Sequence, residues 1–325
     1  MGFVSILFAL LLEQARPLSR GNTLHRLSRA WVRWVGHTLD AGKTQYAVLA
    51  WTAGVLLPGA AVTAVHWALL EGLGWPLAMA WNIVVLYVTL GFRQFSHHFT
   101  NIRNALESGD VEQARQLLAQ WRQVDVGGLP RSEIVRQVVE HSVIAAHRHV
   151  FGVLTWFSIL SALGLGPAGA VIYRLGEFVP RYWRIKGEVA EHPVSAPLQD
   201  VAAQCWRVID WLPARVTALG FAVVGSFEEA IESWRNCAPQ GLSGNDGVIL
   251  AATSGAINLR LGPAASDDGP GLVAAGSTPD RVPPAPFGGQ QPDVGHLRTV
   301  VGLVWRTVLL WMILLALLTL ARLLG

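Results

Sequence analysis

The C-terminal end of the chain carries the feature that most constrains its fold. Residues 300–324 read VVGLVWRTVLLWMILLALLTLARLL, an almost unbroken apolar run. About 20 such residues are enough for a helix to cross the hydrocarbon core of a bilayer. Arg306 and Arg322 stand near the two ends, where long side chains reach the headgroups, so neither excludes insertion. The run therefore predicts a transmembrane helix.

Two further apolar runs lie in the first third of the chain. The first covers Tyr46 to Leu70 and contains Pro58, which is tolerated within a membrane helix. The second covers Trp75 to Phe92, and only Glu71, Gly72, Leu73 and Gly74 separate the two. Because this connection is so short, we expect an antiparallel hairpin that returns to its starting side.

The composition agrees with a membrane protein. Hydrophobic residues make up 52% of the chain and charged residues 14%, where an ordinary soluble chain has roughly 25% charged residues. This balance argues against a soluble enzyme and against intrinsic disorder, which requires low hydrophobicity and high charge. The lysines and arginines are dispersed, so nothing indicates a nucleic-acid partner. The expected partner is the lipid bilayer.

Residues 150–179 form a different kind of apolar segment. Two stretches are separated by Gly164, Gly166, Pro167 and Gly169, a density of helix breakers that favours a broken or re-entrant pair. A single crossing would also carry basic residues across the membrane, namely Arg174, Arg181, Arg184 and Lys186. A re-entrant pair avoids this.

Positive charge predicts the orientation. Arginines are frequent in the loop from Glu13 to Gln45 and again from Arg93 to Arg148, and both segments flank the hairpin on one side. The positive-inside rule places that side in the cytoplasm, which predicts a multi-pass protein of the bacterial inner membrane. The run from Phe3 to Leu12 is too short to cross alone and lacks the features of a cleaved signal peptide.

The sequence thus predicts an all-α, polytopic integral membrane protein in five parts. These are an N-terminal membrane region at 1–92 with its hairpin at 46–92, a cytoplasmic helical segment at 93–149, a broken or re-entrant membrane pair at 150–179, a cytoplasmic or peripheral segment at 180–299 with a flexible loop at 264–291, and a C-terminal transmembrane helix at 300–325.

Two polar segments carry local signals. Asp110 and Gln113 are spaced as in a capping box and predict the start of a helix whose apolar face, with Leu117 and Trp121, packs on its neighbours. Further along, Asn245, Asp246 and Gly247 predict a turn that opens a helix. Its backbone N–H groups could face an anion, but an ordinary capped helix explains the pattern equally well.

These segments, taken in order, resemble a known family, the membrane-bound adenosylcobinamide-phosphate synthases of cobalamin biosynthesis (CobD/CbiB). The similarity covers most of the chain. The matching boxes are SGDVEQAR at 108–115, SEIVR at 132–136, Glu140, DWLPARVTAL at 210–219, the stretch from Asn245 to Gly262 ending in GAINLRLG, and FGG at 287–289. The opening SILFALLLE and the WLPAR box are also similar to AmpE, a membrane protein linked to β-lactamase regulation.

The resemblance implies an ATP-dependent, Mg²⁺-requiring amide condensation between the carboxylate of a corrinoid substrate, adenosylcobyric acid, and aminopropanol or its phosphate. Carried over by position, the implied catalytic residues are Glu140, Asp210 and Glu177. The implied substrate- and phosphate-binding residues are Arg215, Asn245, Gly247, Arg260, Gly288 and Gly289. No residue is assigned to a metal.

The chain departs from the family pattern at acidic positions. After Glu140, where the family has further acidic residues, this chain has Ile144, Ala145 and Arg148, and Leu250 replaces a later glutamate. Two hypotheses therefore stand. The first is an enzyme or enzyme-like protein of cobalamin assembly, and the alternative is a non-catalytic, AmpE-like regulatory or sensory membrane protein. A transporter, suggested by the broken helices alone, is weaker than both.

Overall fold

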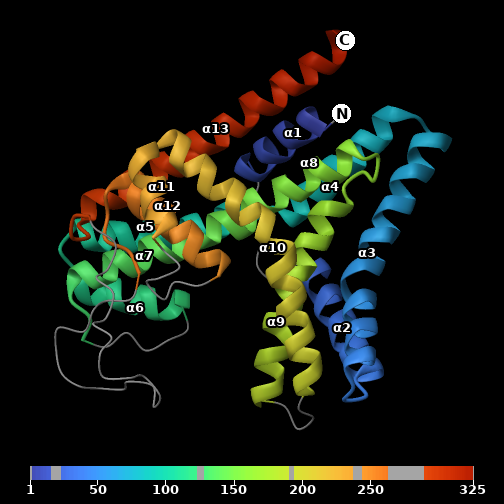
Figure 1. Ribbon diagram of the computed structural model, residues 1–325, viewed down its shortest axis with the longest axis horizontal. Helices are drawn as coiled ribbons and strands as arrows, with labels where there is room; N and C mark the ends of the chain where they lie inside the picture. Colours follow the sequence, from blue (N-terminus) through green and yellow to red (C-terminus); the bar gives the residue numbers. More distant parts are fainter. Residues whose placement is uncertain are drawn as a thin grey trace. The chain divides into compact units, whose positions relative to one another are not determined.

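The computed structural model describes residues 2–15, 23–122, 128–189, 194–236, 244–262 and 289–324. Helices account for nearly all of these residues, and no strand occurs among them apart from an isolated bridge between Leu259 and Gln290 (Figure 1). The predicted all-α class is confirmed. The helices are α1 (Gly2–Ala15), α2 (Thr23–Leu39), α3 (Thr44–Gly72), α4 (Trp75–Thr89), α5 (Phe92–Glu107), α6 (Val111–Arg122), α7 (Arg131–Ala146), the π-helix η1 (His147–Phe151), α8 (Gly152–Ala162), α9 (Ala168–Val189), α10 (Ala196–Val224), α11 (Phe227–Arg235), α12 (Asn245–Ile257) and α13 (Val294–Leu324).

Three stretches of helix in the described residues are long and apolar enough to cross a membrane. They are Thr44–Gly72, Val294–Ala321 and Arg131–Ala162, the last formed by α7, η1 and α8 without interruption. Helices α1 and α4 are apolar but shorter. The chain is thus a polytopic helical membrane protein. The antiparallel hairpin predicted at 46–92 corresponds to α3 and α4, which pack on each other.

The chain divides into two compact units. The first unit comprises residues 1–94, 147–213 and 312–325, and the second comprises residues 95–146 and 214–311.

In the first unit, the broken pair takes the form of a helical hairpin. Helix α8 ends at Ala162, the chain turns, and α9 begins at Ala168 and packs along α8. A Cβ at Gly169 would lie 2.0 Å from the carbonyl oxygen of Trp156, so only glycine permits this approach. The break is where the glycines and proline predicted it. The predicted boundary of the membrane pair at residue 150 falls inside the continuous helix of residues 131–162. How deeply the hairpin enters the bilayer stays a prediction.

A second finding in this unit concerns residues 13–45, which the sequence treats as a loop. Much of this segment is helix α2. Its fully buried Val32 and Val35 belong to an apolar cluster shared with α3, α9 and α10, and Trp183 donates a hydrogen bond to the carbonyl of Val32 (3.3 Å). Burial of one helical face against three partners explains why a segment this rich in arginine is ordered as a helix.

The second unit is built from helices that pack through glycines. Helices α11 and α12 lie so close that a Cβ at Gly255 would be 2.2 Å from the carbonyl oxygen of Glu229. The predicted start of α6 is confirmed, since the backbone N–H of Gln113 donates to Oδ1 of Asp110 (2.9 Å). Of the predicted flexible loop at 264–291, residues 264–288 lie outside the described part of the chain.

Candidate functional site

The acidic residues proposed for catalysis fall in both units. Glu140 lies on α7 in the second unit, whereas Asp210 and Glu177 lie on α10 and α9 in the first.

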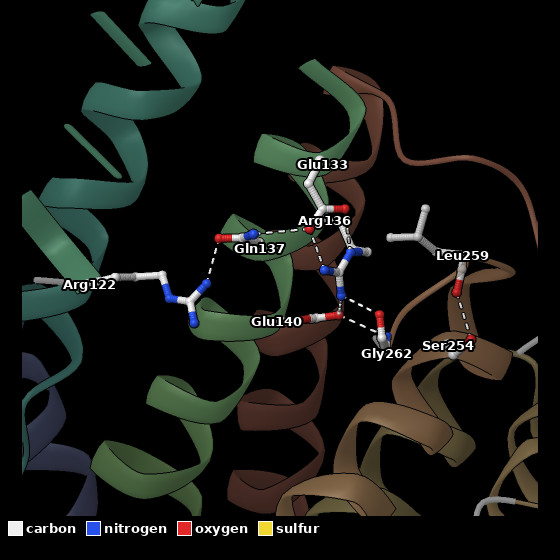
Figure 2. A network of polar contacts seen from close by, with 8 residues as sticks. All are labelled: Arg122, Glu133, Arg136, Gln137, Glu140, Ser254, Leu259 and Gly262. Atoms are coloured by element: carbon white, nitrogen blue, oxygen red, sulfur yellow. Dashed lines mark hydrogen bonds and ion pairs between the residues drawn. The ribbon is translucent and has the colours of Figure 1, made fainter. Parts of the chain in front are cut away.

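Glu140 belongs to a network that joins α7 to the segment after α12 (Figure 2). Its Oε1 accepts a hydrogen bond from Nη1 of Arg136 (2.5 Å) and another from the backbone N–H of Gly262 (2.8 Å). Arg136 also donates to the carbonyl of Gly262 and to both carboxylate oxygens of Glu133. The Glu140 side chain keeps 20% of its surface exposed, and its Oε2 accepts no hydrogen bond from the described residues. One carboxylate oxygen is thus fixed and the other remains open.

The local sequence explains how α7 presents these groups. Glu133, Arg136 and Glu140 are spaced by three and four residues, so they lie on one face of the helix. Gln137, on the same helix, donates to Glu133 (3.0 Å) and accepts from Arg122 of α6 (2.5 Å). The arginine is held by two carboxylates and cannot easily move away.

The segment opposite Glu140 is shaped by the end of α12. Asn258 adopts a left-handed conformation (φ 50°), and Ser254 and Leu259 exchange hydrogen bonds that reverse the chain. The backbone of Arg260 then pairs with Gln290. Gly289 (φ +145°) is required beside this pairing, because a Cβ would lie 2.9 Å from the carbonyl carbon of Leu259. The result is a hydrogen-bonded turn that places Gly262 against Glu140.

Some of the residues proposed for phosphate binding are brought together. Arg215 on α10 donates to the side-chain oxygen of Asn245 (2.5 Å), the first residue of α12. Gly247 is buried in the first turn of the same helix, whose N-terminus has positive partial charge. Arg260 is exposed on the turn described above. Gly289 lies next to the backbone of Arg260. Gly288 lies outside the described residues.

Asp210 has a closed environment in the first unit. Its Oδ1 lies 2.8 Å from Nε2 of His147 and accepts a hydrogen bond from the hydroxyl of Tyr173 (2.8 Å). All three side chains are buried, with Asp210 only 1% exposed. Burial alone would raise the pKa of Asp210, but the hydrogen bonds from His147 and Tyr173 hold the pKa below its ordinary value. This carboxylate is therefore charged, and its Oδ1 is shared by His147 and Tyr173.

Glu177 is equally occupied. Its two oxygens pair with Arg174 (3.3 Å) and Arg181 (3.4 Å), and its side chain is 4% exposed. Arg174 in turn lies 2.7 Å from Nδ1 of His149. The cation partners follow the i−3 and i+4 spacing on α9, so the sequence contained this signal.

Three functional contacts were not predicted from the sequence. These involve Arg136, His147 and Tyr173. The spacing of Arg136 with two glutamates could have indicated the first. Nothing in the sequence indicates the other two, because His147 meets Tyr173 and Asp210 only through the packing of the π-helix η1 on α9 and α10, and π-helical turns are not readable from a pattern.

The acidic side chains of the described residues do not form a Mg²⁺ site within either unit. Such a site needs several oxygen ligands with open lone pairs around one ion. In the first unit Asp210 and Glu177 are buried with hydrogen-bonding or cationic partners, and in the second unit Glu140 offers a single open oxygen, Oε2. In the parts of the chain that are described, no three His, Cys, Asp or Glu side chains could hold a metal ion.

Comparisons with known proteins give one consistent result. The family described as CobD/Cbib protein matches residues 16–272. A cobalamin biosynthesis protein CobD of Stutzerimonas stutzeri is 30% identical over 323 residues, covering 96% of each chain. Proteins of the same name from Chromobacterium violaceum (32% identity, 55% of this chain and 54% of the other) and Mycobacterium tuberculosis (27% identity, 75% and 74%) are also similar.

No solved structure matches the chain. The family match covers most of the chain in one continuous range, and the Stutzerimonas stutzeri relative aligns with it nearly end to end. The chain belongs to the CobD/CbiB family.

Proposed function

We propose that this protein acts in cobalamin biosynthesis and joins the carboxylate of a corrinoid to the amine of aminopropanol or its phosphate in an ATP-dependent amide condensation. The observation that carries the proposal is the near end-to-end similarity to a relative named for cobalamin biosynthesis. The ATP-dependent chemistry comes from the resemblance in the motifs, and the geometry of the second unit supports it.

Glu140 is the residue we assign to proton transfer. An amine attacks an activated carboxyl only after losing a proton, so the site needs a fixed acceptor. The Oε1 of Glu140 is anchored by Arg136 and Gly262, which leaves Oε2 oriented and open. Asp210 and Glu177 lack such an open oxygen at the surface, and we assign them to positioning within the first unit.

Arg215 and the N-terminus of α12 are the groups we assign to an anionic ligand. The guanidinium and the first-turn N–H groups of Asn245 to Gly247 place positive charge at one point, which suits a phosphate of ATP or of aminopropanol phosphate. No step assigned here to a residue uses a protein-bound Mg²⁺, because the described residues do not form its site.

The direct test is chemical. Purified full-length protein is given ATP, Mg²⁺, adenosylcobyric acid and aminopropanol phosphate, and the amide product is measured. Restored growth of a cobalamin auxotroph that lacks its own synthase is the matching cellular test. Product that disappears in Glu140→Gln supports the proposal, and an inactive wild-type protein in both tests contradicts it.

We also propose that the protein resides in the bacterial inner membrane with residues 97–149 in the cytoplasm. The arginine bias around the α3–α4 hairpin supports this orientation. A cysteine introduced at exposed Glu112 should resist a membrane-impermeant thiol reagent in intact cells. Labelling from the periplasm would contradict the orientation.

The alternative function is an AmpE-like regulatory or sensory role without catalysis. Its specific support is that two of the three acidic candidates, Asp210 and Glu177, are buried in ion pairs and hydrogen bonds. Under this alternative the purified protein binds a nucleotide or phosphate through Arg215 but makes no amide product.

A further inference from the structure

Helix α2, in the first unit, carries a stripe of arginines that the chemistry above does not use. Arg26, Arg29 and Arg33 are exposed and are spaced by three and four residues, so they share one face of the helix. We call these three residues the arginine stripe. No acidic residue occurs in the sequence between Glu13 and Asp40, so the stripe has no acidic counterpart on its own helix.

The nearest groups that could neutralise or occupy the stripe are already used or are neutral. Asp40, just beyond the end of α2, accepts hydrogen bonds from the backbone N–H (2.8 Å) and the hydroxyl of Ser195. Arg33 donates through Nε to the hydroxyl of Tyr182 (3.3 Å), which brings no charge. The Nη groups of Arg33 and the guanidinium of Arg29 have no partner in the described part of the chain. Donors therefore remain available for an anion.

A second exposed face of α2 is apolar. Leu27 is 64% exposed and Trp34 is 56% exposed, and a separation of seven residues places them on one side of the helix, next to the arginine stripe. We call these two residues the apolar strip. The ring of Trp34 stacks on that of Trp31, with centroids 5.4 Å apart. The third face of α2 is the packed one, with Val32 and Val35 buried. The helix thus shows water or lipid a cationic surface and an apolar surface side by side.

The position of α2 brings both surfaces to the point where the chain enters the membrane. Helix α2 ends at Leu39, and α3, which is long and apolar enough to cross a bilayer, begins at Thr44. The buried face of α2 shares an apolar cluster with Ala47 and Ala50, so α2 lies along the first turns of α3 (Figure 1). The ends of a membrane-spanning helix lie at the level of the lipid headgroups. The exposed faces of α2 therefore meet this interfacial layer.

We infer that the arginine stripe and the apolar strip of α2 together bind anionic phospholipids. A basic amphipathic helix directly beside the start of a membrane-spanning helix is an arrangement that attracts anionic headgroups. A guanidinium can donate two parallel hydrogen bonds to a phosphate, and tryptophan favours the headgroup level. A soluble anion would use the arginines but leave Leu27 and Trp34 in water. A lipid satisfies both surfaces at once, which is why we assign the site to lipid.

The test places a fluorophore between the two surfaces. Ala30 is exposed on α2, and Ala30→Cys in full-length protein with Cys205→Ala and Cys237→Ala gives one labelling position. The labelled protein is reconstituted into phosphatidylcholine nanodiscs with a small, equal fraction of phosphatidylglycerol or phosphatidylcholine that carries a nitroxide quencher near the headgroup. We expect both lipids to quench, and phosphatidylglycerol to quench about threefold or more strongly, because anionic lipid gathers at the arginines. Raising the salt concentration should weaken this preference.

Variants then show whether the arginines cause the preference. Arg29→Gln with Arg33→Gln should bring the quenching ratio close to one while quenching by phosphatidylcholine persists. The matched control is Arg235→Gln with Arg298→Gln, which removes the same charge from exposed positions in the second unit and should keep the ratio. Arg29→Lys with Arg33→Lys keeps the charge and should retain most of the preference. Equal loss in the glutamine and lysine pairs would mean that packing and not charge is responsible, which overturns the inference.

Two outcomes with the arginines intact also overturn it. Equal quenching by the two lipids would show that α2 does not select anionic lipid, and no quenching would show that α2 does not meet the bilayer. Inorganic phosphate in excess, at constant ionic strength, should leave the preference in place, and its loss would assign the stripe to a soluble anion. None of these measurements involves amide formation, so failure of the lipid site leaves the proposed function standing.

Discussion

Each unit holds a carboxylate against a cation or a ring nitrogen, but the units differ in whether that carboxylate remains accessible to a ligand. In the first unit, Asp210 is enclosed by His147 and Tyr173, and all three side chains are fully buried. In the second unit, Glu140 is anchored through one oxygen and remains 20% exposed. The first arrangement can stabilise helices but cannot reach a ligand, whereas the second can do both. Burial, and not residue type, decides which acid we assign to chemistry.

The largest effect should come from a substitution that forces an extra methyl group against Tyr173, which hydrogen-bonds to Asp210 in the first unit. In Gly152→Ala the new Cβ would lie 2.0 Å from the ring of Tyr173, which is fully buried and cannot move aside. We expect a loss of about 3 kcal/mol or more of stability, and little folded protein in the membrane. Size-exclusion profiles of a fluorescent fusion measure this.

The matched control is Gly54→Ala on α3, where the nearest atom lies at an ordinary 3.8 Å. This change should be neutral or slightly stabilising, because alanine favours a helix by up to about 1 kcal/mol over glycine. A folded Gly152→Ala protein with an unchanged profile would contradict the tight packing of η1 and α8 on Tyr173.

Glu140→Gln should separate chemistry from stability in the second unit. Glutamine can still accept from Gly262 and Arg136, so the fold persists, but it cannot take a proton from the amine. We expect amide formation to fall about 100-fold or more, with thermal stability changed by no more than about 1.5 kcal/mol. Glu112→Gln, an exposed glutamate on α6, is the control and should retain full activity. Activity of Glu140→Gln near the wild-type level would remove Glu140 from catalysis.

Asp210→Asn should show the reverse pattern. The buried charge that holds His147 and Tyr173 is lost, and we expect stability to fall by about 1–3 kcal/mol, with activity per folded molecule largely kept. The pKa of Asp210 is lower in the folded protein than in the unfolded chain, so the charged carboxylate stabilises the fold above about pH 4. This stabilisation is lost as the pH falls through the pKa of Asp210 in the folded protein. The stability difference between wild type and variant should shrink accordingly at low pH.

Asp200→Asn on the same helix serves as the control, because Asp200 is exposed and its removal should change little. A stable Asp210→Asn protein that has lost all turnover would show that Asp210 takes part in the chemistry after all.

The sequence predicted the fold well where hydrophobicity alone determines it. The hairpin of α3 and α4, the C-terminal helix and the break at Gly164 to Gly169 follow from apolar length and helix breakers. Helix α2 was missed because its arginines hide the buried face of Val32 and Val35.

For the site, the order of the motifs singled out Glu140, Arg215 and Asn245, and their roles stay predictions. It could not show that Asp210 is closed, because His147 and Tyr173 reach it across 63 and 37 residues of chain, whereas the partners of Glu177 lie three and four residues away on the same helix. Contacts of that range depend on packing, which no local pattern contains.

The smallest expected effect concerns an ion pair at the surface of the second unit. Arg298 of α13 pairs with Glu107 of α5 (3.0 Å), but its side chain is 74% exposed, against 14% for Arg136 in the Glu140 network. Water screens an exposed pair and the two long side chains lose freedom on pairing, so Arg298→Gln should change the free energy of unfolding by less than about 1 kcal/mol. Arg136→Gln should cost more, because it leaves Glu133 and Glu140 close together without their shared cation. Unfolding of both variants in the same detergent measures the difference, and equal losses would mean that burial does not distinguish the two networks.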